Sequence, residues 1–122
     1  MSSPVITRRS KAVLRIDLNH KPIDTVVIYL NCHPQGLHYV QGWQFDDYME
    51  EVIIPGLHTC TAVDEVFHLT NAPTEILKSE VSSDLLAQIE MYHRNWRSLS
   101  VGDVVWFWNA YFVCEAIGWR KL

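Results

Sequence analysis

Apolar and polar residues alternate along the first part of the chain. From residue 11 to residue 18, every second position is apolar: Ala12, Leu14, Ile16 and Leu18. A period of two predicts a strand with one buried face. Thr25 to Leu30 is a continuous run of β-branched, aromatic and aliphatic residues, which is typical of a strand covered on both faces. We expect these two segments to form an antiparallel pair.

The next segments favour a short strand and then a helix. Leu37 to Val40 lies between Gly36 and Gly42 and is interpreted as a short strand. Apolar residues then recur at spacings of three and four, which predicts a helix that ends at Pro55: Phe45, Tyr48, Met49, Val52 and Ile53. Asp46 and Asp47 would lie near its N-terminus, where the helix dipole favours negative charge.

Two further helices are predicted before the last strands. Thr61 to Asp64 resembles a capping box, and the helical face that follows consists of Val63, Val66, Phe67 and Thr70. Pro73 stops this helix. Ser82 or Ser83 caps the next helix, whose apolar face consists of Leu85, Ile89, Tyr92 and Trp96.

The chain closes with an aromatic hairpin between Asp103 and Trp119. We expect strands at Val104–Trp108 and Tyr111–Ile117, joined by the two residues Asn109 and Ala110. Alternation places residues 104, 106 and 108 on one face and residues 105 and 107 on the other. Because both faces are apolar, the first of these strands should be covered on both sides.

The order of elements defines the expected fold class. Two strands, a helical middle and two strands predict an α+β fold, with an antiparallel sheet or small open barrel and about three helices on one face. A parallel βαβ fold would require alternating strands and helices, which the pattern lacks. The 122 residues fit one domain. Residues 1–10 are interpreted as a flexible arm and residues 11–122 as a single α+β domain.

Composition and charge narrow the function classes. The chain has 10 Lys and Arg and 14 Asp and Glu, so its net charge is −4, which argues against non-specific nucleic-acid binding as the main activity. No apolar run approaches the ~18 residues of a membrane span. The N-terminus lacks the apolar stretch of a signal peptide, so we expect a cytoplasmic protein without a membrane partner. Three cysteines without framework spacing indicate free thiols.

Aromatic and acidic residues suggest a protein-binding surface. The chain has five Trp, five Tyr and four Phe, which serve either a core or an interface. Acidic residues crowd the predicted helix at 45–53, where they form a solvated face or a docking surface for a basic partner. The candidate binding residues are Trp43, Asp46, Asp47, Glu50, Glu51, Trp106 and Trp108. The preferred hypothesis is a non-catalytic protein-binding module, and a Trp-rich hairpin edge would also allow a homodimer.

A nucleic-acid-binding module is the alternative hypothesis. Single strands are held by a mixture of positive charge and stacking rings. The chain offers this mixture at a helix end and in its N-terminal arm, through Arg94, Trp96, Arg97, Arg8, Arg9 and Lys11. Trp96 also continues an apolar helical face, which favours a place in the core.

A metal site or an enzyme is the weakest hypothesis. Five nitrogen and sulfur donors could ligate Zn²⁺, namely Cys32, His33, His38, His58 and Cys60. Their spacing contains no C-x2-C or H-x3-H pair, which favours buried thiols and surface histidines. No P-loop, G-x-G-x-x-G, G-x-S-x-G or H-E-x-x-H motif is present. We therefore expect no cofactor and assign no catalytic residue.

The C-terminal half resembles a group of small domains. Residues 65–71 read EVFHLTN, residues 97–105 read RSLSVGDVV, and Tyr111 to Cys114 and Gly118–Trp119 follow. This string is similar to the R-S-[LM]-S-V-G-D-V-V hairpin signature of YodL-like and large-polyvalent-protein-associated domains of phage, plasmid and mobile-element genomes. The resemblance covers residues 62–119. It implies an accessory module of mobile-element origin and no particular activity.

Overall fold

One antiparallel sheet organises the molecule. The computed structural model describes residues 7–8, 14–16, 26–33 and 35–122. Within these residues, seven strands form a sheet in the order β1-β4-β3-β5-β6-β7, and β2 also pairs with β4. The strands are β1 (Thr7–Arg8), β2 (Leu14–Arg15), β3 (Val27–Asn31), β4 (Tyr48–Ile53), β5 (Val104–Phe107), β6 (Ala110–Cys114) and β7 (Trp119–Lys121). The rest of the predicted arm at 1–10 lies outside the described residues.

Strand β4 corrects the predicted helix at 45–53. It pairs with β3 along one edge and with β1 and β2 along the other. Met49 and Val52 point to opposite faces and are both fully buried, so the apolar positions do not show simple alternation. The predicted pairing of 11–18 with 25–30 is also wrong for the described residues, because β2 and β3 each pair with β4 instead of with each other.

Four α-helices and one 3-10 helix connect the strands. They are α1 (His38–Gln41), η1 (Pro55–Thr59), α2 (Val63–Asn71), α3 (Thr74–Leu77) and α4 (Ser83–Asn95). Helices α2 and α4 are confirmed, and the side chain of Ser82 caps α4 by accepting a hydrogen bond from the Leu85 amide. The predicted capping box at Thr61–Asp64 is wrong, because α2 begins after Ala62 without a side-chain cap. The predicted strand at 37–40 is wrong, because this segment forms α1 between Gly36 and Gly42. The sequence pattern did not indicate α3 or η1.

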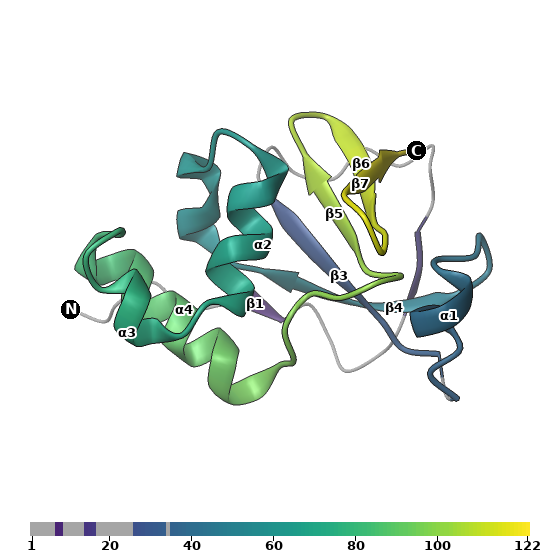
Figure 1. The fold of residues 1–122 in the computed structure, drawn as a ribbon, viewed down its shortest axis with the longest axis horizontal. Helices are drawn as coiled ribbons and strands as arrows, with labels where there is room; N and C mark the ends of the chain where they lie inside the picture. Colours follow the sequence, from purple (N-terminus) through teal and green to yellow (C-terminus); the bar gives the residue numbers. More distant parts are fainter. Residues whose placement is uncertain (1–6, 9–13, 17–25, 34) are drawn as a thin grey trace.

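The principal core lies between the sheet and three helices. Figure 1 shows α2, α3 and α4 grouped together, with α1 at the opposite end of the molecule. One face of β3, β4 and β5 packs against this helical group, and the buried helix residues are Val66, Leu69, Leu77, Leu85, Ile89 and Tyr92. The α+β class, with about three helices on one face of an antiparallel sheet, is therefore confirmed.

The opposite face of the sheet carries a second cluster of buried residues. Its members are Ile16, Val27, Tyr29, Trp43, Met49, Val104, Trp106, Tyr111 and Val113. Tyr29 is hydrogen-bonded to the side chains of Tyr111 and Glu51, and burial is the main reason that the pKa of Tyr29 is raised. All four residues of β5 are buried, which confirms that this strand is covered on both faces.

The closing hairpin turns one residue earlier than expected. Trp108 and Asn109 have φ angles of 51° and 63°, so they form the turn, and Ala110 already belongs to β6. Trp108 is therefore 71% exposed instead of sharing the covered face of Trp106. Strand β6 ends at Cys114, and the chain then turns back to add β7.

Candidate binding site

A buried ion pair lies at the start of β5. Arg97 Nη1 lies 2.5 Å from Asp103 Oδ2, and Arg97 Nη2 donates to Oδ1 at 2.7 Å. The Asp103 side chain is fully buried, whereas one third of the Arg97 side chain is exposed. Burial alone would lower the pKa of Arg97, but the hydrogen bonds and negative charge of Asp103 raise it. The two-pronged geometry is the strong form of an arginine–carboxylate contact.

The same carboxylate joins segments that are far apart in the sequence. Asp103 accepts the backbone N–H of Asn31 at 2.7 Å and that of Ser100 at 2.8 Å. Arg97 in turn donates to the Asn31 carbonyl at 3.0 Å. The end of β3 is thus tied to the turn before β5 by both members of the ion pair.

Asn31 extends this network to β4. Its side-chain amide donates to Asp47 Oδ2 at 2.9 Å and to the Gly102 carbonyl at 3.1 Å. The backbone N–H of Gln44 also donates to Asp47 Oδ2, at 2.9 Å. Asp47 is only 8% exposed, and in the described part of the chain it has no Lys or Arg partner.

A pocket opens beside Asp47. It has a volume of about 540 Å³ and is lined by Cys32, His33, Gln41, Gln44, Asp46, Asp47 and Tyr48. These residues come from the end of β3, from α1 and the loop after it, and from the first residue of β4. Two carboxylates face this pocket, and no Lys or Arg is among its lining residues.

Helix α1 packs against the turn before β5. Gly102 has a φ angle of 91°, and a Cβ atom there would lie 2.7 Å from His38 Cβ and 2.9 Å from the His38 carbonyl oxygen. The His38 ring contacts that of Tyr39 at a centroid distance of 4.1 Å. Neither ring nitrogen of His38 has a hydrogen-bond partner among the described residues. Burial lowers the pKa of this histidine, so its neutral form is favoured.

The segment from residue 37 to residue 48 exposes several large apolar side chains. Its exposed members are Leu37, Tyr39, Val40, Phe45 and Tyr48, and we call them the 37–48 surface. Val40 is the most exposed of them, at 87%. Arg97 lies over the Tyr39 ring, 5.8 Å from its centroid, so the ion pair also supports this surface. The sequence prediction missed this surface, although the density of aromatic residues between Gly36 and Met49 was a visible signal.

The predicted protein-binding residues fall into different environments. Trp43, Glu51 and Trp106 are buried on the second face of the sheet. Glu50 is half-buried and accepts a hydrogen bond from the Trp96 indole at 3.1 Å. Asp46 and Asp47 both line the pocket. Trp108 is exposed at the hairpin turn.

Two of the six predicted nucleic-acid residues, Arg97 and Trp96, are engaged in the fold. Arg97 pairs with Asp103, and Trp96 stacks on Tyr92 at a centroid distance of 5.8 Å. Arg94 is exposed near the end of α4. Of the predicted N-terminal cluster, Arg9 and Lys11 lie outside the described residues, and Arg8 is placed only by its pairing in β1.

The candidate metal ligands do not converge. Among the described residues, no group of three or more His, Cys, Asp or Glu side chains could hold a metal ion. Cys32 and His33 line the pocket, whereas His38 is the buried first residue of α1. His58 Nδ1 lies 2.7 Å from the Pro55 carbonyl oxygen, on η1. Cys60 lines a separate pocket.

The thiols lack the environment of a catalytic nucleophile. All three cysteines are free. Burial raises the pKa of Cys60 to about 11 and that of Cys114 to about 11. The pKa of Cys32 is raised by burial and by the charge of Glu50. A nucleophilic cysteine requires the opposite shift, because the thiolate is its reactive form.

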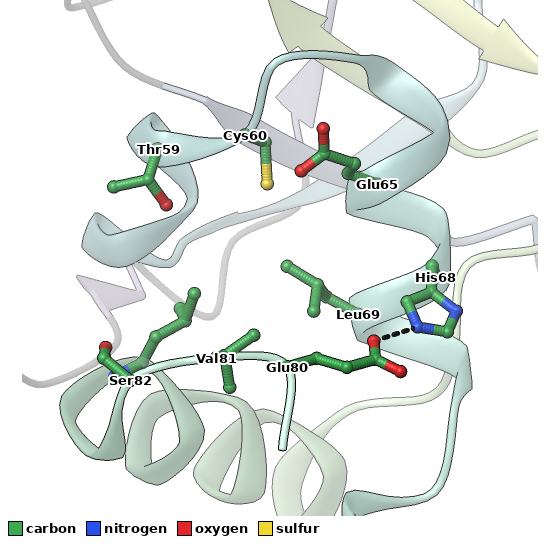
Figure 2. A pocket seen from close by; sticks show the side chains of 9 residues that line it. Thr59, Cys60, Glu65, His68, Leu69, Glu80, Val81 and Ser82 are labelled. Carbon is green, nitrogen blue, oxygen red and sulfur yellow. Dashed lines mark hydrogen bonds and ion pairs between the residues drawn. The ribbon is translucent and has the colours of Figure 1, made fainter. Parts of the chain in front are cut away.

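A second pocket of about 450 Å³ lies among α2, η1 and the chain before α4. Figure 2 shows Leu69 and Val81 pointing into its centre, with Cys60 above them. His68 Nε2 and Glu80 Oε1 lie 2.7 Å apart and join α2 to the opposite wall. The other acidic lining residue, Glu65, accepts hydrogen bonds from Thr61. Both carboxylates of this pocket therefore already have partners.

Comparison with known proteins gives no family assignment. No protein-family model, curated protein or solved structure matches the chain. The resemblance of residues 62–119 to phage and plasmid domains therefore stays a prediction. Among the described residues, the helices are too short or too polar to cross a membrane.

Proposed function

We propose that this protein is a non-catalytic binding module that docks onto another protein through the 37–48 surface. The observation that carries this proposal is the concentration of exposed apolar side chains in one short segment. Five large apolar residues lie within twelve positions of that segment: Leu37, Tyr39, Val40, Phe45 and Tyr48. Exposed apolar patches with polar surroundings mark interaction sites, because water contact with them is unfavourable.

The support beneath this surface favours a preformed docking site. Helix α1 contacts Gly102 through His38, and Tyr39 contacts Arg97. Arg97 is held by the fully buried Asp103. A surface fixed in this way loses little conformational entropy on binding, which improves affinity. The raised pKa values of the thiols also favour binding over covalent catalysis.

We further propose a cytoplasmic location and an origin in a phage or another mobile element. Three free cysteines suit a reducing compartment. The signature shared with phage and plasmid domains contains Arg97, Ser100, Gly102 and Asp103, which are the residues of the ion-pair network. Because these residues support the proposed docking surface, the string is consistent with an accessory module that binds partners.

The test compares partner capture by three forms of the full chain. A Val40→Ser/Phe45→Ser variant removes apolar surface from the docking segment. Ile117→Ser is the matched control, because Ile117 is 94% exposed but lies in the turn between β6 and β7. We expect the same proteins to be retained by the wild type and the control and lost from the double variant. Quantitative mass spectrometry of the bound fractions measures this difference.

Two outcomes would contradict the proposal. One is that no captured protein depends on Val40 and Phe45. The other is that the Ile117 control loses the same proteins, since the effect would then be one of general surface hydrophobicity. Sedimentation of the purified chain shows whether a second copy occupies the surface, and a dimer that the double variant abolishes would replace a foreign partner with self-association.

A further inference from the structure

The carboxylate of Asp47 is buried without a countercharge among the described side chains. Its side chain is 8% exposed, and no Lys or Arg pairs with it in the described part of the chain. Charged groups that are nearly buried are normally paired, because removing them from water is costly. The other buried aspartate of this region, Asp103, follows that rule through Arg97.

The surroundings of Asp47 hold it in one orientation. The Asn31 side chain and the Gln44 backbone N–H both donate to Oδ2, each at 2.9 Å. Asn31 is itself held by Gly102 and Asp103. The carboxylate is therefore preorganised by neutral donors in a wall of the pocket.

The remaining walls of this pocket also suit a cation. Asp46 adds a second, exposed carboxylate, and the amide side chains of Gln41 and Gln44 offer further oxygen acceptors. Tyr48 lines the same pocket, and an aromatic ring attracts a cation through its face. Among the described side chains, that of Arg97 has its positive charge matched by Asp103.

We propose that this pocket receives an arginine or lysine side chain of the protein that docks on the 37–48 surface. This inference rests on the proposed function and specifies the chemistry of its partner: a segment with a basic residue beside apolar ones. Two observations favour a partner's side chain over a free ion. Tyr48 belongs to both the pocket and the apolar surface, and Gln41 and Gln44 lie within the segment that carries that surface.

The test uses small probes and the full chain. The amide NMR spectrum is recorded during titration with N-acetyl-arginine amide and, separately, with its neutral isostere N-acetyl-citrulline amide. We expect the arginine probe to cause saturable shifts at Gln44, Asp46 and Asp47, and the citrulline probe to bind about tenfold more weakly.

Variants locate the bound probe. Asp47→Asn removes the buried charge and should weaken arginine binding about tenfold. Asp46→Asn affects an exposed residue outside the hydrogen-bond network, so it keeps the test valid if the Asp47 variant does not fold. We expect that variant to weaken binding about threefold. Glu80→Gln, in the second pocket, should leave the affinity unchanged.

Three results would overturn this proposal. They are equal shifts with the arginine and citrulline probes, shifts centred on Glu65 and Glu80, and no saturation at millimolar probe. Failure of the titration would end the cation proposal alone, because partner capture through Val40 and Phe45 is measured independently. Conversely, if the Val40→Ser/Phe45→Ser variant captures the same proteins as the wild type, the docking proposal is wrong whatever the titration shows.

Discussion

The Arg97 guanidinium donates hydrogen bonds to both carboxylate oxygens of Asp103, a fully buried residue six positions further along the chain. Since Asp103 also accepts the backbone N–H groups of Asn31 and Ser100, the pair connects β3, the turn before β5 and β5 itself. This contact is linked to the 37–48 surface through Tyr39 and to the pocket through Asn31 and Asp47.

We predict that Asp103→Ala lowers the free energy of unfolding by about 3 kcal/mol, because it leaves the half-buried Arg97 and two backbone N–H donors without their acceptor. Urea unfolding followed by circular dichroism measures the change. Asp46→Ala is the control, because Asp46 is exposed and should cost less than about 0.5 kcal/mol. Equal losses for the two variants would show that the buried pair adds nothing to stability.

Gly102 should tolerate no side chain. Its φ angle is 91°, and an added Cβ would meet the Cβ and carbonyl oxygen of His38. Gly42 has a φ angle of 75°, with nothing within 4 Å of an added Cβ. We predict that Gly102→Ala costs more than Gly42→Ala, whose loss should be about 1 kcal/mol from backbone strain alone. Thermal unfolding of both variants measures the difference, and a larger loss for Gly42→Ala would refute the close approach of α1.

His38 should make the protein less stable in mild acid. Because burial lowers its pKa in the folded state, the unfolded chain binds the proton more tightly near pH 6. Its contribution is therefore complete above the ordinary histidine pKa of about 6.5 and is lost as the pH falls towards the lower folded value. Asp103 and Asp47 oppose this shift, whereas Arg97 and His33 add to it.

The measurement for His38 is the free energy of unfolding between pH 7.5 and pH 5. We expect His38→Phe, which retains an aromatic ring against Tyr39, to reduce the slope of this acid limb. His58→Phe is the control, because His58 is exposed on η1. An unchanged slope in the His38 variant would mean that other groups cause the acid sensitivity.

Thiol reactivity should separate the three cysteines. Cys32 is half-buried, whereas Cys60 and Cys114 are buried and have pKa values of about 11. We predict that iodoacetamide at pH 8 alkylates Cys32 first and reaches the other two only after local opening, because the thiolate is the reactive form. Mass spectrometry of peptides over time measures the order. Prior labelling of Cys60 would show that the second pocket exposes its thiol.

The hairpin turn offers a stabilising substitution. Trp108 and Asn109 both have positive φ angles, a conformation that suits Asn-Gly much better than Trp-Asn. We predict that Trp108→Asn/Asn109→Gly raises the free energy of unfolding by about 1 kcal/mol. Destabilisation would mean that the contact of Trp108 with Phe107, at a centroid distance of 5.9 Å, outweighs the turn strain.

The sequence pattern predicted helices with a periodic apolar face and strands whose residues are almost all apolar. Helix α4 presents Leu85, Ile89 and Tyr92 to the core at helical spacing, and the pattern identified them. Strand β4 was misinterpreted because its apolar residues recur at spacings of three and four and because Glu51 occupies a core position through its bond to Tyr29. A polar residue with a partner from another strand looks like a surface residue when only the sequence is considered.

The site was less predictable because its residues meet only in the folded chain. Asn31 and Asp103 are separated by 72 positions, so no local spacing indicates their contact. The string around Ser100 and Gly102 was visible, but alone it predicts only a turn. The string supports α1 only together with Asn31 and Arg97, and the sequence pattern does not predict the hydrogen bonds of these two residues.

The sheet order also constrains how the chain can fold. Strand β3 lies between β4 and β5, and its pairing joins Tyr29 to Val104. During synthesis, β3 can pair with β4 early, but its other edge stays open until nearly the whole described chain has been made. Long-range pairing of this kind folds slowly and leaves an unpaired strand exposed in the meantime. Assembly in the cell should therefore depend on the interval between synthesis of β4 and arrival of β5, which is when aggregation would compete.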